Sequence, residues 1–305
     1  MRTGPARILF VSGKGGTGKS FVAEALARSA VSHGLDVALL RVRAAAGADE
    51  HGSQAAEPAT TGSGSSHRRG RAAPSATFKE TVLDERATLE KFLTRVLRLG
   101  FVARRLLDSR TFSAIAAATP GLRDLVTLSA ITALASHGRR RGFDLIVVDA
   151  PASGHTIPLL TAPALVLDIA PLGPVAQEAR AARALIANES RFLPLIVTTP
   201  EELAVTEALS LYDDLLGAGI PAPRIVVNGL WPGHLRPEHV EWLLTTGASI
   251  DALLYEKRRR RQLELVAVLE HRVGRCPTLP FTFREDEVPE AAIAALLDTV
   301  LGALR

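Results

Sequence analysis

Eight residues near the amino terminus constrain this chain more than any others. Gly13 to Ser20 reads GKGGTGKS and matches the phosphate-binding loop pattern G-x-x-x-x-G-K-[ST]. The apolar run from Ile8 to Ser12 predicts a strand before the loop, and Phe21 to Ser29 predicts a helix after it. In that order the glycines turn backbone N–H groups toward phosphate oxygens, Lys19 neutralises the outer phosphates and the Ser20 hydroxyl ligates Mg²⁺. The pattern predicts a nucleoside triphosphate site rather than a glycine-rich turn before a helix.

A second lysine, Lys14, stands near the entrance of the loop, where the loop does not obviously turn it onto its own phosphates. The variant K-G-G-x-G-K-[ST] resembles the deviant loop of the ParA, MinD and ArsA group of ATPases. That resemblance implies that Lys14 reaches across a dimer to the partner's phosphates. The alternative is a solvated loop lysine. The expected nucleotide contacts are Gly13, Lys14, Gly15, Gly16, Thr17, Gly18, Lys19, Ser20 and Phe21.

The composition describes the body that carries this loop. Of the 305 residues, 47% are hydrophobic but only 5% are aromatic, so the core has to be built from Ala, Leu, Val and Ile. The single cysteine, Cys276, rules out an intrachain disulfide and fits the reducing cytoplasm. We expect no signal peptide, because Met1 to Ser12 lacks an apolar core region. We also expect no transmembrane segment, because prolines and Asp168 interrupt the most apolar stretch, Leu159 to Ala176.

Positive charge is clustered although the net charge is only +4. The clusters are His67 to Arg71, Arg139 to Arg141 and Lys257 to Arg261. Such clusters are compatible with nucleic acid or anionic lipid. Solvated loops and helix ends are the better interpretation, because no aromatic residues alternate with the arginines to stack on bases. We therefore expect no stable nucleic-acid binding.

The order of strands and helices predicts the fold class. Apolar strands alternate with helix-like sequence, which indicates a doubly wound, mostly parallel α/β sheet with helices on both faces. The phosphate loop then lies at the carboxyl ends of the strands. After the first strand, the expected strands are Val37 to Val42, Thr77 to Leu83, Phe143 to Asp149, Leu193 to Thr198, Arg224 to Asn228 and, near an edge, Cys276 to Leu279.

Two segments depart from this alternation within a single domain, residues 1–305. Residues 44–76 are rich in Ala, Gly, Ser, Thr and Pro, and we expect a disordered loop there because the segment cannot bury enough apolar surface. Residues 85–137 have helical periodicity, broken at Thr119 to Gly121 before a second amphipathic run from Leu122 to His137. This block predicts a helical subdomain inserted in the α/β core.

Asp149 ends one of the apolar strands, as the Walker B carboxylate does. In that role it would hold Mg²⁺ through water, opposite Ser20. A strand-ending aspartate can also cap the next helix.

Residues Asp149 to Thr156, DAPASGHT, resemble the switch II motif D-T-A-P-T-G-H-T of the ArsA family. That family contains the arsenite-pump ATPase and the ATPase that targets tail-anchored membrane proteins. Further similar stretches bring the resemblance to nearly the whole chain outside residues 44–76: Ala118 to Leu128, Thr198 to Leu215 and Arg224 to Asn228.

The resemblance implies a P-loop NTPase fold of the ParA/MinD type with an added helical subdomain, and a dimer whose two ATP sites face each other. It assigns Asp149 to the Mg²⁺ shell, Asn228 to an adenine contact, and Gly154 and His155 to switch II. Two simpler roles remain open: Asn228 as a strand cap and His155 as a packed or orienting residue. A glycine in switch II lets the backbone move when the γ-phosphate leaves.

Two features depart from the family pattern. Where its switch I reads D-P-A and the aspartate positions the attacking water, this chain has Arg43-Ala44-Ala45. The chain also has one cysteine and only the initiator methionine, which excludes a cysteine trio for arsenite, a C-x-x-C zinc bridge and a methionine-rich client groove. Leu, Val and Phe side chains of the helical block could still form an apolar client groove.

The combined interpretation is a Mg²⁺-dependent, dimeric ATPase with slow turnover. Its expected catalytic residues are Lys14, Lys19 and Asp149, with Ser20 and Asp149 at the metal. It would act as a homodimer, or as a heterodimer with a paralogous ATPase, and couple ATP to a protein client on the helical subdomain. One alternative is a nucleotide-binding regulatory subunit that has lost catalysis. A ParA-like DNA-positioning ATPase is disfavoured by the G-H-T segment and the helical insertion.

Overall fold

The protein is described from a computed structural model of residues 1–305. The described part of the chain comprises residues 6–42, 76–97, 121–136, 142–233, 250–282 and 289–304, with the isolated positions 241 and 245. The expected disordered loop at residues 44–76 lies almost wholly outside the described residues, as do Arg43 and two of the three basic clusters, His67 to Arg71 and Arg139 to Arg141.

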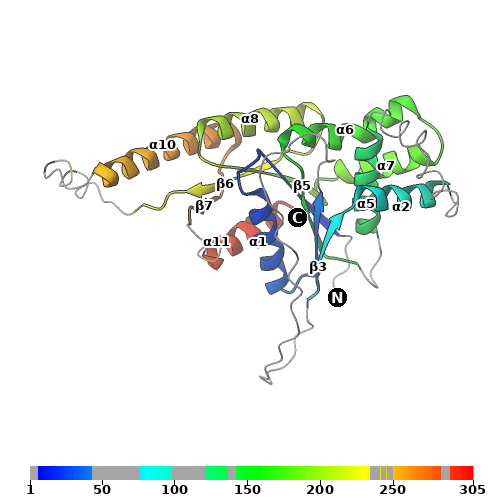
Figure 1. Ribbon diagram of the computed structural model, residues 1–305, viewed down its shortest axis with the longest axis horizontal. Coiled ribbons are helices and arrows are strands. Elements are labelled where there is room, and N and C mark those ends of the chain that lie inside the picture. The colour runs from blue at the N-terminus through cyan, green and yellow to red at the C-terminus, as the bar shows by residue number, and fades with distance from the viewer. Residues whose placement is uncertain are drawn as a thin grey trace, which may run out of the picture.

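In the described part of the chain, seven parallel strands form one twisted sheet (Figure 1). Their order is β3-β2-β4-β1-β5-β6-β7, so β1 lies in the middle between β4 and β5. The strands are β1 (Arg7–Ser12), β2 (Val37–Val42), β3 (Phe78–Leu83), β4 (Leu145–Asp149), β5 (Phe192–Thr198), β6 (Arg224–Leu230) and β7 (Thr278–Pro280). Because all neighbours are parallel, the carboxyl ends of the strands share one edge of the sheet.

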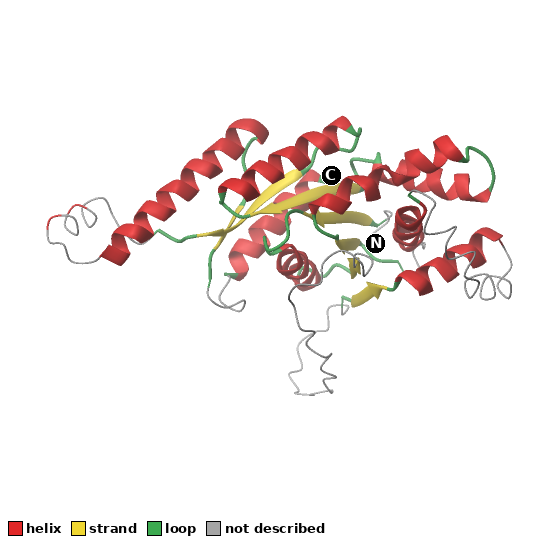
Figure 2. Cartoon of the chain, turned by 45° about the horizontal axis from the view of Figure 1, so that its top comes forward, coloured by secondary structure: helices red, strands yellow, loops and turns green. Residues whose placement is uncertain are grey.

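Helices cover both faces of the sheet (Figure 2). One face carries α1 (Lys19–Ser32) and α11 (Glu290–Ala303), which pack into one hydrophobic cluster with the sheet. The remaining described helices pack into a second cluster on the opposite face. They are α2 (Glu85–Leu97), α5 (Leu122–Ser136), α6 (Ser153–Ile169), α7 (Pro174–Ile186), α8 (Glu202–Gly217) and α10 (Ile250–Val273).

The central strand β1 shows why the strands are almost continuously apolar. Ile8 and Phe10 pack into the cluster beneath α5 to α8, whereas Leu9 and Val11 pack beneath α1 and α11. All four are fully buried. A strand covered on both faces has no solvent side on which polar residues can alternate.

The strands predicted from the sequence are confirmed, with small differences at their ends. The strand before Asp149 begins at Leu145 rather than Phe143, and the last one begins at Thr278 rather than Cys276. The first helix extends past Ser29 to Ser32. Within the predicted helical block, α2 and α5 are described, and both pack against α7. No helix in the described part of the chain is both long and apolar enough to cross a bilayer.

Candidate nucleotide site

The predicted phosphate loop lies at the carboxyl end of β1, and two of its glycines are required by close contacts. Gly13 has a φ of +140°, and a Cβ there would lie 2.1 Å from the Val197 carbonyl oxygen on β5. Gly18 has a φ of +84°, and a Cβ there would lie 2.3 Å from the Asn228 Nδ2 atom on β6. Side chains are excluded at both ends of the loop, which leaves its backbone free to approach an anion.

Helix α1 begins directly after the loop and points its amino terminus at the same place. It has Gly18 as its N-cap and no acidic residue in its first turn, so the positive end of the helix dipole is not neutralised locally. Lys19 is half-buried and donates to the Lys14 carbonyl oxygen at 3.3 Å. Burial lowers the pKa of Lys19, and the carboxylates of Asp149 and Glu207 oppose that shift. A glycine-rich loop, a helix amino terminus and a lysine are the features that make up anion-binding sites in proteins.

Asp149 lies at the carboxyl end of β4 and is 7% exposed. Its Oδ2 atom is 3.4 Å from Nη1 of Arg41, whereas its buried Oδ1 atom has no hydrogen-bond partner among the residues that the structure describes. A buried carboxylate oxygen without a partner is costly in a protein, and a metal-bound water would satisfy it. Asp149 and the exposed hydroxyl of Ser20 in the first turn of α1 therefore fit a Mg²⁺ ion held mainly by phosphates and water.

The segment that follows Asp149 is tied to the loop by its backbone. The Ala150 N–H donates to the Val11 carbonyl at 3.0 Å, and the Ser153 N–H donates to the Gly13 carbonyl at 3.1 Å. The buried Ser12 and Thr156 hydroxyls share a hydrogen bond. His155 is exposed, and its backbone N–H donates to the Ala152 carbonyl in the first turn of α6. Residues 150–156 thus contact the phosphate loop directly, as a segment that responds to the phosphates would have to.

Glu207 on α8 is a site residue that the motif analysis missed. Its carboxylate is 3.1 Å from Nζ of Lys14 and also accepts a hydrogen bond from the Ser153 hydroxyl. The Ser153 hydrogen bond lowers the pKa of Glu207, with a further contribution from Lys14. Glu207 therefore connects the phosphate loop to the segment after Asp149. The acidic residue was visible in the sequence at Thr198 to Leu215, but no local pattern showed what it faces.

Arg41 on β2 is the second such residue. It stands opposite Asp149 in the β2–β4 register and forms ion pairs with Glu24 at 2.7 Å, Glu80 at 2.6 Å and Asp149 at 3.4 Å. Burial disfavours its charge, but hydrogen bonds to Glu80 and Glu24 outweigh that effect and raise its pKa. The sequence pattern singled out Arg43, which lies outside the described residues, and gave no role to Arg41. The usable signal was a charged residue near the end of a buried strand.

Asn228 and Phe21 lie near the loop in different ways. Asn228 donates from Nδ2 to the Thr17 carbonyl at 3.0 Å and thereby supports the loop from β6. Phe21 is half-buried on α1 and lines a cavity of about 1040 Å³ together with Ser20, Glu24 and Arg41. The Oδ1 atom of Asn228 remains available for a ligand such as adenine, whereas its Nδ2 atom contacts the loop.

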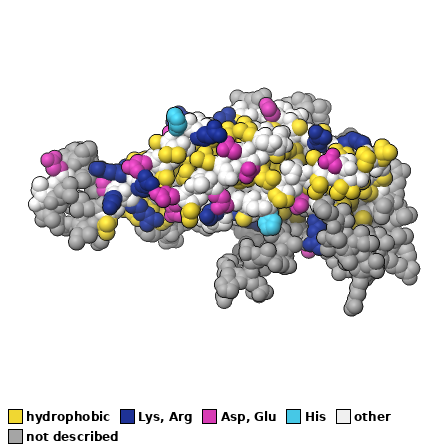
Figure 3. All heavy atoms as spheres, turned by 90° about the horizontal axis from the view of Figure 1, so that it is seen from above, with side chains coloured by type: hydrophobic (Ala, Val, Ile, Leu, Met, Phe, Trp, Pro, Cys, Tyr) yellow, Lys and Arg dark blue, Asp and Glu magenta, His cyan; other side chains and the backbone are white. Residues whose placement is uncertain are grey.

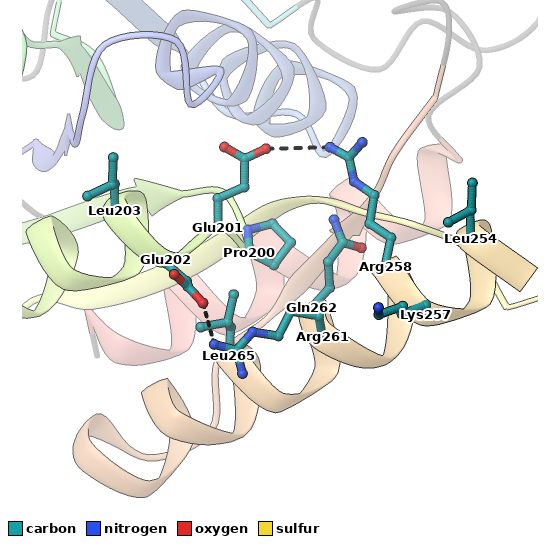
Figure 4. A pocket seen from close by; sticks show the side chains of 10 residues that line it. All are labelled: Pro200, Glu201, Glu202, Leu203, Leu254, Lys257, Arg258, Arg261, Gln262 and Leu265. Atoms are coloured by element: carbon teal, nitrogen blue, oxygen red, sulfur yellow. Dashed lines mark hydrogen bonds and ion pairs between the residues drawn. The ribbon is translucent and has the colours of Figure 1, made fainter.

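The third basic cluster, Lys257 to Arg261, lies on α10 away from this loop. Its arginines form ion pairs with nearby carboxylates, Arg258 with Glu201 at 3.7 Å and Arg261 with Glu202 (Figure 4). These side chains line a second cavity of about 550 Å³ between α8 and α10. Among the described residues, no group of three or more His, Cys, Asp and Glu side chains is arranged to hold a metal.

Known proteins are similar to this chain in sequence over most of its length. "ATPase BagA" of Mycobacterium tuberculosis (strain ATCC 25618 / H37Rv) is 30% identical over 244 residues, which cover 78% of this chain and 69% of BagA. The same values hold for "Putative ATPase Mb3704" of Mycobacterium bovis. The chain belongs to this family of ATPases. No general family model matches it. Membership agrees with the α/β sheet and with a phosphate loop at the carboxyl end of its central strand.

Proposed function

We propose that this chain is a Mg²⁺-dependent ATPase switch that acts as a dimer in the cytoplasm. ATP binding and slow hydrolysis would change its affinity for a partner or a client protein. The observation that carries the proposal is the placement of Lys19, the amino terminus of α1 and the unpartnered Oδ1 atom of Asp149 around one loop. Positive donors would meet the phosphates there, and the Asp149 carboxylate would hold their metal ion.

The chain's own residues divide the work. The loop backbone and Lys19 would hold the phosphates and stabilise charge on the transferring phosphoryl group. Asp149 and Ser20 would hold Mg²⁺, which supplies electrostatic stabilisation of the same charge. Lys14, now paired with Glu207, would turn to the partner subunit's nucleotide in the dimer. Helices α2 and α5 are the described part of the layer on which a client would dock.

The test is binding of ATP by calorimetry, with and without Mg²⁺, in the parent and in Lys19→Ala. We expect the variant to bind at least about tenfold more weakly, because a hydrogen bond to a charged group contributes roughly 1.5–3 kcal/mol. Lys257→Ala, which removes a lysine from α10, is the matched control and should leave affinity unchanged. Equal affinity in the parent and Lys19→Ala would show that the loop does not hold phosphates.

A second candidate function is a regulatory subunit that binds ATP without turning it over. The pairing of Arg41 with Asp149 favours it, together with Arg43 at the family's aspartate position. A guanidinium group cannot accept a hydrogen bond from the attacking water. Single-turnover hydrolysis by the pure protein, alone and with paralogous ATPases, separates the two candidates. Slow turnover by the chain alone would favour the ATPase switch, whereas ATP binding without any turnover, with hydrolysis only when a paralogue is added, would favour the regulatory subunit.

A further inference from the structure

The guanidinium group of Arg41 forms ion pairs with three carboxylates beside the proposed metal site. Arg41 Nη2 is 2.7 Å from Glu24 on α1, its Nε is 2.6 Å from Glu80 on β3, and its Nη1 is 3.4 Å from Asp149 on β4. The side chain of Arg41 is only 25% exposed, and that of Asp149 only 9%. These charges are therefore weakly screened by solvent, and their interactions are stronger than those of surface pairs.

The three contacts are not equivalent. Glu24 and Glu80 approach Arg41 at normal hydrogen-bond distances, whereas Asp149 is the farthest of the three carboxylates. The contact with Asp149 uses only Oδ2 and leaves the buried Oδ1 unpartnered among the described side chains. Arg41 and Glu24 also line the same cavity as Ser20. The guanidinium thus lies beside Asp149, one of the two residues assigned to the metal, and is held mainly by the other two carboxylates.

We propose that Arg41 is a built-in counter-ion of the metal site, which neutralises Asp149 in the nucleotide-free protein and raises the Mg²⁺ concentration that the site needs. The inference rests on the proposed nucleotide site. A carboxylate that shares its charge with a guanidinium attracts a divalent cation less strongly. If a metal ion binds to Asp149, Glu24 and Glu80 keep the Arg41 guanidinium paired, so that its charge does not have to move into solvent.

The test compares divalent-metal binding in Arg41→Gln and in the parent. Mn²⁺ serves as the probe, and the free ion is measured by electron paramagnetic resonance, first with the protein alone and then with ATP present. We expect Arg41→Gln to bind Mn²⁺ at least about fivefold more tightly, because a charge interaction of about 1 kcal/mol corresponds to that factor. The Mg²⁺ concentration for half-maximal ATP binding should fall by a similar factor.

Arg28→Gln is the matched control. Arg28 also pairs with Glu24 at 2.7 Å, but no contact joins it to Asp149 among the described interactions. The substitution removes the same charge from the same carboxylate neighbourhood, so it should change Mn²⁺ affinity less than about twofold. Equal shifts in Arg28→Gln and Arg41→Gln would overturn the proposal, because the effect would then be one of net charge.

Glu80→Gln tests the same idea in the opposite direction. Without Glu80 the guanidinium loses its 2.6 Å partner and is free to pair more closely with Asp149. Mn²⁺ should then bind about two- to threefold more weakly. Because Glu80 is 40% exposed on β3, this variant is expected to fold, so it decides the question if Arg41→Gln does not. Thermal unfolding monitored by circular dichroism identifies a folding failure.

The remaining outcomes separate this inference from the proposed function. Unchanged or weaker Mn²⁺ binding in a folded Arg41→Gln would overturn the counter-ion role and indicate that Arg41 only holds Asp149 in position. If neither the parent nor any variant binds ATP, but Mn²⁺ still binds most tightly to Arg41→Gln and most weakly to Glu80→Gln, the proposed function fails and the counter-ion role stands. If ATP binds and Glu80→Gln shows no weakening, the counter-ion role fails alone.

Discussion

In the described part of the chain, positive charge gathers at the phosphate loop and on helix α10. At the loop, Lys14, Lys19 and Arg41 are half-buried, and their carboxylate neighbours belong to α1, β3, β4 and α8. On α10, Arg260 and Arg261 are exposed and pair with nearby residues of the same helix or of α8. Figure 3 shows the acidic and basic side chains interspersed over that end of the molecule.

The difference shows that a run of cations does not make an anion site by itself. Lys257 to Arg261 is the denser cluster in the sequence, yet most of its charge is neutralised where it stands. Lys19 is a single lysine, but burial lowers its pKa and the helix dipole of α1 adds to its charge. Backbone geometry and burial, more than the number of charges, distinguish the two regions.

The largest expected contrast comes from one methyl group in each region. Gly13→Ala places a Cβ 2.1 Å from the Val197 carbonyl, which is part of the sheet and cannot move. We expect it to destabilise the fold by more than about 3 kcal/mol and to abolish ATP binding. Gly233→Ala meets the Arg259 guanidinium at 2.7 Å, which is the flexible end of a side chain, and should cost less than about 1 kcal/mol.

Urea unfolding and ATP calorimetry measure both glycine effects. Gly15→Ala is the control within the loop, because nothing lies within 4 Å of a Cβ there. It should fold like the parent. Equal destabilisation by Gly13→Ala and Gly233→Ala would show that the loop is no more rigid than the α10 region.

Local sequence was sufficient for the parts of the site that are contiguous. The strand before the loop, the glycines and the helix after it are adjacent in the chain, so their order alone predicted an anion site. The buried strands were predictable for the same reason, because parallel strands covered on both faces leave uninterrupted apolar runs such as Leu145 to Val148. Asp149 follows such a run and could be identified by its position.

The missing parts depend on pairs that lie far apart in the chain. Glu207 meets Lys14 only because α8 follows β5, which is the neighbour of β1. Arg41 meets Asp149 only because β2 lies beside β4, in a register that no local pattern encodes. A strand order was needed before either residue could be assigned. Comparison with the family motif pointed only to Arg43, two residues further along the chain and outside the described residues.

The next contrast concerns two lysines, the half-buried Lys14 at the loop and the exposed Lys257 on α10. If Lys14 leaves Glu207 to reach a partner's phosphates, Lys14→Ala should weaken ATP-dependent dimerisation by about tenfold or more, in line with the roughly 1.5–3 kcal/mol of a charged hydrogen bond. ATP binding by the single subunit should change little. Lys257→Ala should affect neither. Sedimentation with ATP distinguishes these results, and dimerisation equal to the parent would return Lys14 to the role of a solvated lysine.

Lowering the pH should reduce the stability of the loop region more than that of α10. We expect this effect to be smaller than that of Lys14→Ala on dimerisation. The Ser153 hydrogen bond and Lys14 lower the pKa of Glu207 in the folded protein. Its stabilisation is therefore fully present above the unfolded-state value, about 4.3, and is lost as the pH falls through the folded value. Between about pH 5 and pH 3 the parent should lose more stability than Glu207→Gln. Glu256→Gln on α10 is the control, and parallel curves for parent and Glu207→Gln would contradict the coupling.

The smallest effect is expected where the cations are most numerous. Arg260 pairs with Glu256 one helical turn away, and its side chain is 63% exposed. Arg260→Gln should change the free energy of unfolding by less than about 0.5 kcal/mol, because exposed i,i+4 pairs contribute little. ATP affinity should stay the same, and a DNA duplex should not bind at physiological salt. Salt-sensitive duplex binding that weakens in Arg260→Gln would reverse the comparison, since α10 would then present free positive charge to a phosphate backbone.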